Sequence, residues 1–166
     1  MTKRKIYRNA ITSKDAEFLL NKDWAIDEIL GKEHASLTNV KDVPVINKLL
    51  EIIRKDFDFE IGGIKESYIR IETRGKGHRW HNDQGGYTKD DDNLHMEWCQ
   101  VGVSILLSDE SEFTGGDTYY ADIDFSNEEN KIKSDRRQYD MCAHTSDSWH
   151  MVEPHEGSRT VLLMFI

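Results

Sequence analysis

The sequence predicts a mainly β fold, an antiparallel sandwich or jelly roll with a helical flank on its N-terminal side. Three observations predict it: helical spacing of apolar residues before residue 60, strand-like alternation after Gly62 and Gly63, and short alternating segments separated by turn-rich stretches. Helices followed by a series of short strands are typical of an all-β core with helices packed beside it. The 166 residues suit one domain, 1–166, with the flank over about 1–60 and the β core over about 64–166.

Two helices are expected in the flank. Thr12 or Ser13 can cap a helix that runs over about residues 14–30 and ends at Gly31. Its apolar positions include Phe18, Leu19, Ile26 and Leu30. Pro44 is well placed in the first turn of a second helix. The apolar stripe of that helix consists of Ile46, Leu49, Leu50, Ile53 and Phe57, which recur at helical spacing.

Short strands are expected in the rest of the chain, over residues 66–73, 101–108, 118–123, 139–145, 149–152 and 159–166. Within 101–108, alternation places Val101, Val103, Ile105 and Leu107 on one face. Two long connections, 84–94 and 126–137, interrupt the strands. The sequence leaves open whether they are functional or are solvated insertions.

The composition argues against several classes of partner. A formal net charge of -9 and the lack of a basic patch disfavour a nucleic acid. No apolar stretch is long enough to cross a bilayer and the first residues lack the apolar run of a secretory signal, so no membrane is expected. Cys99 and Cys142 are too few for a disulfide framework and are expected as buried free thiols, which favours the cytoplasm. The oligomeric state is not indicated.

A metal site is predicted from two segments far apart in the chain. His81 and Asp83 are two residues apart, so on a strand or its frayed end an imidazole and a carboxylate point to the same side. Such a triplet arises often by chance, and a polar strand end explains it equally well. His150, in a short strand near the C-terminus, supplies a third ligand. Two histidines and one carboxylate leave one face of a metal open, which suits iron(II) with a co-substrate and dioxygen, whereas a structural zinc site closes its shell.

Arg159 adds a feature specific to the co-substrate. It follows His150 by nine residues, and the turn between them contains Pro154 and Gly157, so a hairpin can bring the two side by side. A guanidinium pairs with a carboxylate in bidentate geometry, so Arg159 can hold the distal carboxylate of 2-oxoglutarate. A surface arginine at a strand start is the plainer alternative. It is disfavoured because the strand that follows is almost wholly apolar and a buried charge needs a partner.

These residues belong to a longer pattern. It consists of HND (81–83), FTGGDT (113–118), WHMVEP (149–154) and GSR (157–159). The pattern resembles the 2-oxoglutarate/Fe(II) oxygenase superfamily. It is most similar to the prolyl-4-hydroxylase-like branch, in which HxD, a Gly-Gly turn and HxVxP with a downstream GxR occur in that order. The resemblance covers about residues 64–166, and the combination is specific although each piece is not.

The resemblance implies a double-stranded β-helix, a cupin-like jelly roll, with His81, Asp83 and His150 as iron ligands and Arg159 as the 2-oxoglutarate anchor. It implies a dioxygenase that uses Fe(II), 2-oxoglutarate and O2, with ascorbate as a candidate additive. The reaction would hydroxylate a free or peptidyl amino acid, with proline as one candidate, and release succinate and CO2. No catalytic side chain beyond the metal site is expected. Many relatives carry a tyrosine on the strand after HxD; its expected equivalent here is Leu106, which leaves open how firmly 2-oxoglutarate is held.

Alternative ligands stay open at this point. The triplet HME (95–97) could replace HND, through an error in register. His155 could replace His150, but Arg159 would then follow by only four residues, too few for a turn and a strand. His78 and His144 are expected as surface groups or as outer contacts of the site.

Other contacts and other functions stay open as well. Tyr68, Trp80 and Trp149 are candidates for contacts with the substrate or just outside the metal ligands, and core packing is the plainer interpretation of the tryptophans. The fold could also serve as a non-catalytic, metal-binding jelly roll that binds a ligand. A metal-dependent enzyme without 2-oxoglutarate is a third hypothesis.

Overall fold

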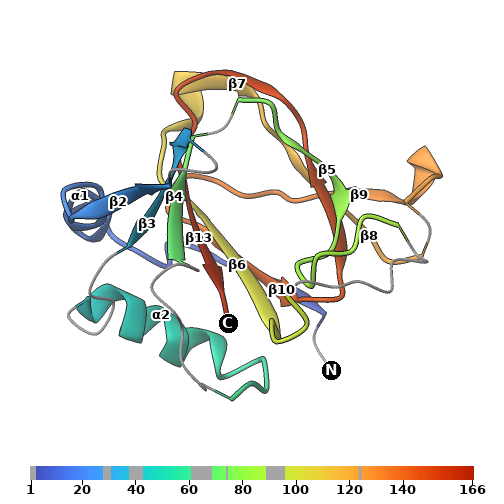
Figure 1. Ribbon diagram of the computed structural model, residues 1–166, viewed down its shortest axis with the longest axis horizontal. Coiled ribbons are helices and arrows are strands. Elements are labelled where there is room, and N and C mark those ends of the chain that lie inside the picture. Colours follow the sequence, from blue (N-terminus) through green and yellow to red (C-terminus); the bar gives the residue numbers. More distant parts are fainter. Residues whose placement is uncertain are drawn as a thin grey trace.

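A computed structural model of the chain describes residues 3–27, 31–37, 43–60, 69–73, 75–88, 96–123 and 125–166 (Figure 1). These residues form a mostly β fold with two α-helices, and all their strand pairings are antiparallel. A seven-stranded and a four-stranded sheet lie on opposite sides of the interior, an arrangement consistent with a jelly-roll core. No helix in the described ranges is long and apolar enough to span a membrane.

The larger sheet joins strands from both ends of the chain, in the order β1-β10-β6-β13-β4-β3-β2. In that order its strands are Arg4–Tyr7, Met141–Thr145, Val101–Leu106, Val161–Phe165, Ile69–Glu72, Gly31–Leu37 and Trp24–Asp27. Ser104 of β6 is paired with Cys142 of β10 on one side and with Leu163 of β13 on the other. Segments far apart in sequence are thereby held as direct neighbours.

The smaller sheet has the order β5-β11-β8-β9, formed by His78–His81, Trp149–Val152, Thr118–Ala121 and Lys131–Lys133. It lies on the right of Figure 1, across the interior from β6 and β13. A separate pair, β12 (His155–Gly157) and β7 (Phe113–Gly115), closes one end. Short 3-10 turns, η3 (Glu110–Glu112) and η4 (Glu128–Asn130), precede β7 and β9. The connection predicted over 126–137 is therefore a loop only in part.

The first helix, α1 (Ser13–Leu20), begins as expected and ends early. The Thr12 hydroxyl accepts a hydrogen bond from the Asp15 backbone N–H at 3.1 Å, and the Asp15 carboxylate accepts one from the Thr12 N–H at 2.9 Å. This reciprocal cap satisfies two backbone donors of the first turn. The predicted span of about 14–30 is nevertheless wrong over 21–27, where the chain turns and forms β2, and residues 28–30 lie outside the described ones.

The residues after α1 form a β-hairpin at the edge of the larger sheet. The Trp24 indole N–H donates to the Leu19 carbonyl oxygen at 2.6 Å, so the chain turns back on the helix instead of extending it. Gly31 begins β3 and does not end a helix, and β3 pairs with β4. The flank expected over about 1–60 is thus helical only in part, because pairing to an existing sheet overrides helical spacing.

The second helix, α2 (Pro44–Ile53), is confirmed. Pro44 lies in the first turn, where a missing N–H removes no helical hydrogen bond. The predicted stripe is buried throughout, with Phe57 contributed by the segment just after the helix: Ile46, Leu49, Leu50, Ile53 and Phe57. Burial of each such side chain stabilises the fold by about 1.5–3 kcal/mol relative to exposure. This stripe holds α2 against the larger sheet.

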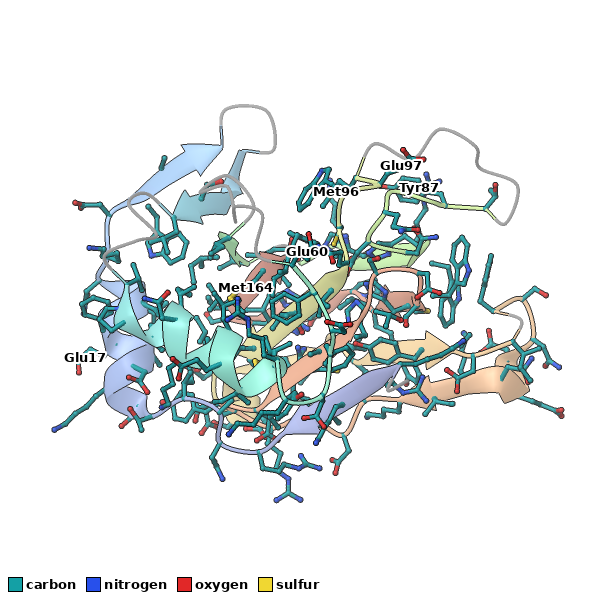
Figure 2. All side chains as sticks on the ribbon, turned by 90° about the horizontal axis from the view of Figure 1, so that it is seen from below. Glu17, Glu60, Tyr87, Met96, Glu97 and Met164 are labelled. Atoms are coloured by element: carbon teal, nitrogen blue, oxygen red, sulfur yellow. The ribbon has the colours of Figure 1, made fainter. Side chains whose placement is uncertain are left out.

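The two faces of the larger sheet differ: one packs in the hydrophobic core, and the other carries polar residues together with apolar ones such as Leu106 and Val161. The predicted shared face of β6 is confirmed, since Val101, Val103, Ile105 and Leu107 all belong to the hydrophobic core. Met164 of β13 lies in the same core, on the side of the sheet that α2 covers (Figure 2). Alternation turns Gly102 and Ser104 of β6 to the opposite side, toward the smaller sheet. Polar groups inside the molecule therefore collect between the two sheets.

A buried carboxylate fixes the turn that leads into β10. The Asp140 side chain accepts hydrogen bonds from Arg8 Nη1 at 2.6 Å, the Asn9 N–H at 2.9 Å and the Arg137 N–H at 3.0 Å. Burial opposes ionisation of Asp140, but these donors outweigh it and lower the pKa of the carboxyl group. The N-terminal segment is thereby joined to β10, its neighbour in the sheet.

Candidate metal centre

His81, Asp83 and His150 converge between the sheets. His81 of β5 is the direct cross-strand partner of His150 of β11, and Asp83 lies in the turn just after β5. Asp83 Oδ1 is 3.4 Å from His150 Nε2 and 4.0 Å from His81 Nε2. The ligand atoms of the three residues lie within 4.8 Å of one another, the only such group found among the described residues. The structure thus brings together the three residues that the sequence predicted as metal ligands.

Backbone carbonyls set the orientation of both imidazoles. His81 Nδ1 is 2.7 Å from the Arg79 carbonyl oxygen, and His150 Nδ1 is 2.9 Å from the Ser148 carbonyl oxygen. A carbonyl accepts only, so each Nδ1 carries a proton and donates it, which leaves Nε2 as the ring atom that faces Asp83. Burial and the neighbouring His150 lower the pKa of His81 to about 3, so the His81 ring stays neutral. The His81 ring is therefore ready to bind a cation without losing a proton first.

Asp83 is held on its far side by a buried chain of side chains. Its Oδ2 accepts a hydrogen bond from His144 Nε2 at 2.7 Å. His144 Nδ1 is 3.1 Å from the Tyr120 hydroxyl, which is 3.2 Å from Cys142 Sγ. Burial works against the charge on Asp83, but His150 and His144 outweigh it and hold the pKa of the carboxyl well below its usual value. Oδ1 is thereby left facing the two imidazoles as an ionised oxygen.

Gly102 gives this carboxylate its space. A Cβ at Gly102 would lie 1.7 Å from Asp83 Oδ2 and 2.6 Å from His144 Nε2. Gly102 is the cross-strand partner of His144, so β6 and β10 together form the wall behind Asp83. Any larger residue at this position would push the carboxylate away from the imidazoles.

The donor set fits a divalent metal with open positions. Two imidazole nitrogens and one carboxylate oxygen converge on one point, the ligand set typical of non-haem iron(II). Each ring is oriented by a carbonyl and the carboxylate by His144, the outer contacts that metal ligands commonly require.

Arg159 lines a cavity of about 200 Å³. The residue is only 4% exposed, and burial, together with the nearby Arg136, lowers the pKa of its guanidinium to about 10. The Gly-Gly turn makes room for it: a Cβ at Gly116 would lie 2.6 Å from Arg159 Cδ. Gly115 and Gly116 also have positive φ angles of 77° and 72°, which favour glycine. Leu106, the expected equivalent of the helper tyrosine, lines the same cavity.

The other candidates lie apart from the cluster or outside the described residues. Trp80 and Trp149 each precede a histidine of the cluster, so their side chains lie on the other face of the smaller sheet. Both contact Phe125 there, at 5.6 and 4.7 Å between ring centroids. His155 lies in β12, against Phe113. His78 donates to the buried Glu72 carboxylate at 2.8 Å. Tyr68 and most of the HME alternative, including its histidine, lie outside the described residues.

The expectation for His144 left two alternatives, an outer contact of the site or a surface group. The first is confirmed, because His144 is a buried partner of Asp83. The alternation of β10 carried a usable signal, since Met141 and Ala143 face the hydrophobic core and place His144 on the other face with Cys142. Nothing in the sequence marked Gly102 or Arg136, because both depend on contacts between distant segments.

The chain matches no protein-family model, and the search of curated proteins finds no similar sequence. Solved structures do match its fold. A prolyl-4-hydroxylase from Pseudomonas putida aligns with a TM-score of 0.59 and 12% identity, over 98% of this chain and 90% of that chain. A viral collagen prolyl hydroxylase from Paramecium bursaria Chlorella virus-1, in its 2-oxoglutarate complex, gives 0.58 and 13%, over 98% and 93%.

HygX from Streptomyces hygroscopicus, with nickel and 2-oxoglutarate bound, aligns with a TM-score of 0.55 and 14% identity, over 98% of this chain and 81% of that chain. Identities this low show the fold alone. What these matches confirm is a fold shared with solved 2-oxoglutarate/Fe(II) oxygenases, prolyl-4-hydroxylases among them.

Proposed function

We propose that this chain is a single-domain Fe(II)- and 2-oxoglutarate-dependent dioxygenase that hydroxylates a free or peptidyl amino acid. The observation that carries the proposal is the convergence of His81, Asp83 and His150, with ligand atoms within 4.8 Å of one another, in a fold whose interior also holds the buried Arg159. Succinate and CO2 are the expected products from 2-oxoglutarate, and prolyl residues are one candidate substrate.

The protein contributes a preset ligand geometry. His81 and His150 would each bind the metal through Nε2, because Nδ1 is engaged by a carbonyl oxygen. Asp83 would bind through Oδ1, because His144 occupies Oδ2. When bound, iron(II) with 2-oxoglutarate and dioxygen supplies the oxidising chemistry that side chains lack. The buried contacts behind Asp83 keep its carboxylate from rotating. The side of the cluster opposite the three ligand atoms would therefore stay open.

Arg159 would hold the distal carboxylate of 2-oxoglutarate. Its guanidinium stays charged despite burial, since its lowered pKa of about 10 is still far above neutral pH. A charged fork in a confined cavity forms strong bidentate hydrogen bonds to a carboxylate. The cavity runs beside Thr118, two residues along β8 from the Tyr120 that touches the ring of His144, so it lies along the same wall as the metal cluster.

The open side of the cluster faces the segment around Tyr87. The Tyr87 ring is 6.3 Å from the His81 ring, and the Arg79 guanidinium lies 4.1 Å above it. Tyr87, Met96 and Glu97 lie close together at one edge of the molecule (Figure 2). The Met96 N–H donates to the Gln84 carbonyl at 2.9 Å, which joins the two described ends of the long connection. We place the substrate entrance at this edge.

Succinate formation tests the proposal. Purified protein supplied with Fe(II), 2-oxoglutarate, ascorbate and O2 should release succinate, slowly and without added substrate, and faster with the right proline-containing peptide or amino acid. Asp83→Ala should abolish release, whereas Asp58→Ala, the same change at an exposed carboxylate, should not. If the wild type released no succinate above the Asp83→Ala background, the enzyme proposal would fail and a non-catalytic metal-binding module would remain.

A further inference from the structure

The cavity beside Arg159 contains a second guanidinium that the proposed function does not use. Arg136 belongs to the segment between β9 and β10 and lines the same cavity as Arg159. Its Nη1 donates to the Ser104 hydroxyl of β6, and its Nη2 is 3.5 Å from Thr118 Oγ1 of β8. The side chain therefore reaches across the interior from one sheet to the other.

Neither guanidinium has a carboxylate within ion-pair distance among the described residues. Three acidic groups whose charges act on them have other partners: Asp117 lies 2.5 Å from Lys133, Asp140 lies 2.6 Å from Arg8, and Glu72 lies 2.8 Å from His78. Glu110, which lines the cavity with Asp117, is exposed. Two like charges are thus confined in one cavity. Burial and the nearby Arg136 lower the pKa of Arg159, and burial lowers the pKa of Arg136. A buried charge without a partner is costly, so an anionic ligand would stabilise this arrangement.

A third donor points to the same kind of ligand. Ser134 Oγ, in the lining of the cavity, is buried and has no hydrogen-bond partner. Buried hydroxyls are almost always hydrogen-bonded, so an unpaired one marks a place where a ligand atom or water belongs. The lining thus offers two guanidiniums and an unpaired hydroxyl, beside two carboxylates, those of Asp117 and Glu110, and the apolar side chains of Leu106 and Phe113. A carboxylate, with four lone-pair sites on two oxygens, matches this set.

We propose that Arg136 is a second anchor for the distal carboxylate of the 2-oxo acid, and that Arg136 and Arg159 together select dicarboxylate over monocarboxylate 2-oxo acids. This inference rests on the proposed function for the identity of the ligand. Arg136 supplies the hydrogen-bond donors that Leu106 lacks. It is a specificity-determining residue, since it contacts the end of the co-substrate farthest from the metal ligands.

The test compares two acids of equal length in four proteins. The acids are 2-oxoglutarate and 2-oxovalerate, which lacks the distal carboxylate. The proteins are the wild type, Arg136→Gln, Arg136→Lys and Arg137→Gln, the last being a matched change at the exposed neighbour. Dissociation constants are measured by calorimetry on the Fe(II)-loaded proteins without oxygen.

Arg136→Gln should weaken 2-oxoglutarate binding by about tenfold or more, the loss expected for a charge-assisted hydrogen bond. The same variant should bind 2-oxovalerate within about twofold of the wild type. Arg137→Gln should bind both acids within about twofold of the wild type. Arg136→Lys, which keeps the charge without the fork, should fall in between. Thermal unfolding of each variant reports folding, and the rise in unfolding temperature on adding 2-oxoglutarate should be smaller for Arg136→Gln even if that variant is less stable.

Equal weakening of both acids would assign Arg136 a structural role and overturn the inference, as would unchanged binding of 2-oxoglutarate. A wild type that bound the two acids equally would overturn it too. Failure of the proposed function would give a different result. The wild type would then bind 2-oxoglutarate with a contribution from Arg136 and yet release no succinate.

Discussion

Gly102→Ala is a minimal change that reaches the proposed metal ligands. The added methyl group would stand 1.7 Å from Asp83 Oδ2, whereas ordinary contact begins near 3.4 Å. Either the carboxylate or the backbone of β6 must therefore move by roughly 1.7 Å, and β6 is fixed by β10 and β13 on both sides. We expect the carboxylate to give way, taking Oδ1 out of reach of a metal bound by His81 and His150.

The expected effect is much larger on metal binding than on folding. A ligand displaced by more than an ångström should lower Fe(II) affinity and succinate formation by about 100-fold or more. One extra methyl group in a packed interior costs about 1–3 kcal/mol of unfolding free energy. Anaerobic Fe(II) titration by calorimetry measures the first quantity, and urea unfolding of the metal-free protein measures the second.

Gly75→Ala is the matched control. The same methyl group would meet only the His155 carbonyl oxygen, at 3.3 Å, so metal affinity should stay within about twofold of the wild type. The reasoning would be refuted if Gly102→Ala bound Fe(II) as tightly as Gly75→Ala, because Asp83 would then not be confined by β6.

The remaining predictions concern three other groups. His144→Ala removes the donor to Asp83 Oδ2 and should weaken Fe(II) binding by about 10–100-fold; unchanged affinity in the calorimeter would contradict this role. Arg159→Ala should raise the 2-oxoglutarate KM by about 100-fold; turnover that is indifferent to this change would favour a metal enzyme without 2-oxoglutarate. Asp140→Asn should cost about 1–3 kcal/mol at pH 7. The pKa of Asp140 is lowered in the folded protein, so its stabilisation is present above the unfolded pKa of about 3.9 and is lost as pH falls through the folded value. Urea unfolding should therefore show that the difference in unfolding free energy between the wild type and Asp140→Asn shrinks below about pH 4. A difference that stayed constant down to about pH 3 would contradict this role of Asp140.

The parts of the fold that were predictable are those in which a local pattern matches the tertiary environment. Pro44 and the apolar stripe after it specify α2 within one segment. The shared face of β6 follows from period-two alternation, and it packs as alternation requires. His81 and Asp83 are predictable for the same reason, since their two-residue spacing directs both to one side. His150 and Arg159 are predictable as a pair because nine residues separate them along the chain.

The wrong or missed parts depend on pairing between segments far apart in sequence. Residues after Leu20 satisfy helical spacing nearly as well as alternation, and their pairing with β3, itself fixed by β4, decided the outcome. β1 pairs with β10, more than a hundred residues away, and its four residues are too few to show a pattern. Arg136 and Arg137 are indistinguishable in sequence, yet only Arg136 reaches the interior.

The central claim is that three side chains from β5, the turn after it and β11 hold one Fe(II). Anaerobic Fe(II) titration of the wild type, His81→Ala, Asp83→Ala and His150→Ala tests it most directly, with His155→Ala as the control histidine. The account predicts one tightly bound Fe(II) per chain in the wild type and in His155→Ala, and a loss of affinity of about 100-fold or more in each of the other three. Binding of wild-type strength in any of those three, or its loss in His155→Ala alone, would contradict the account.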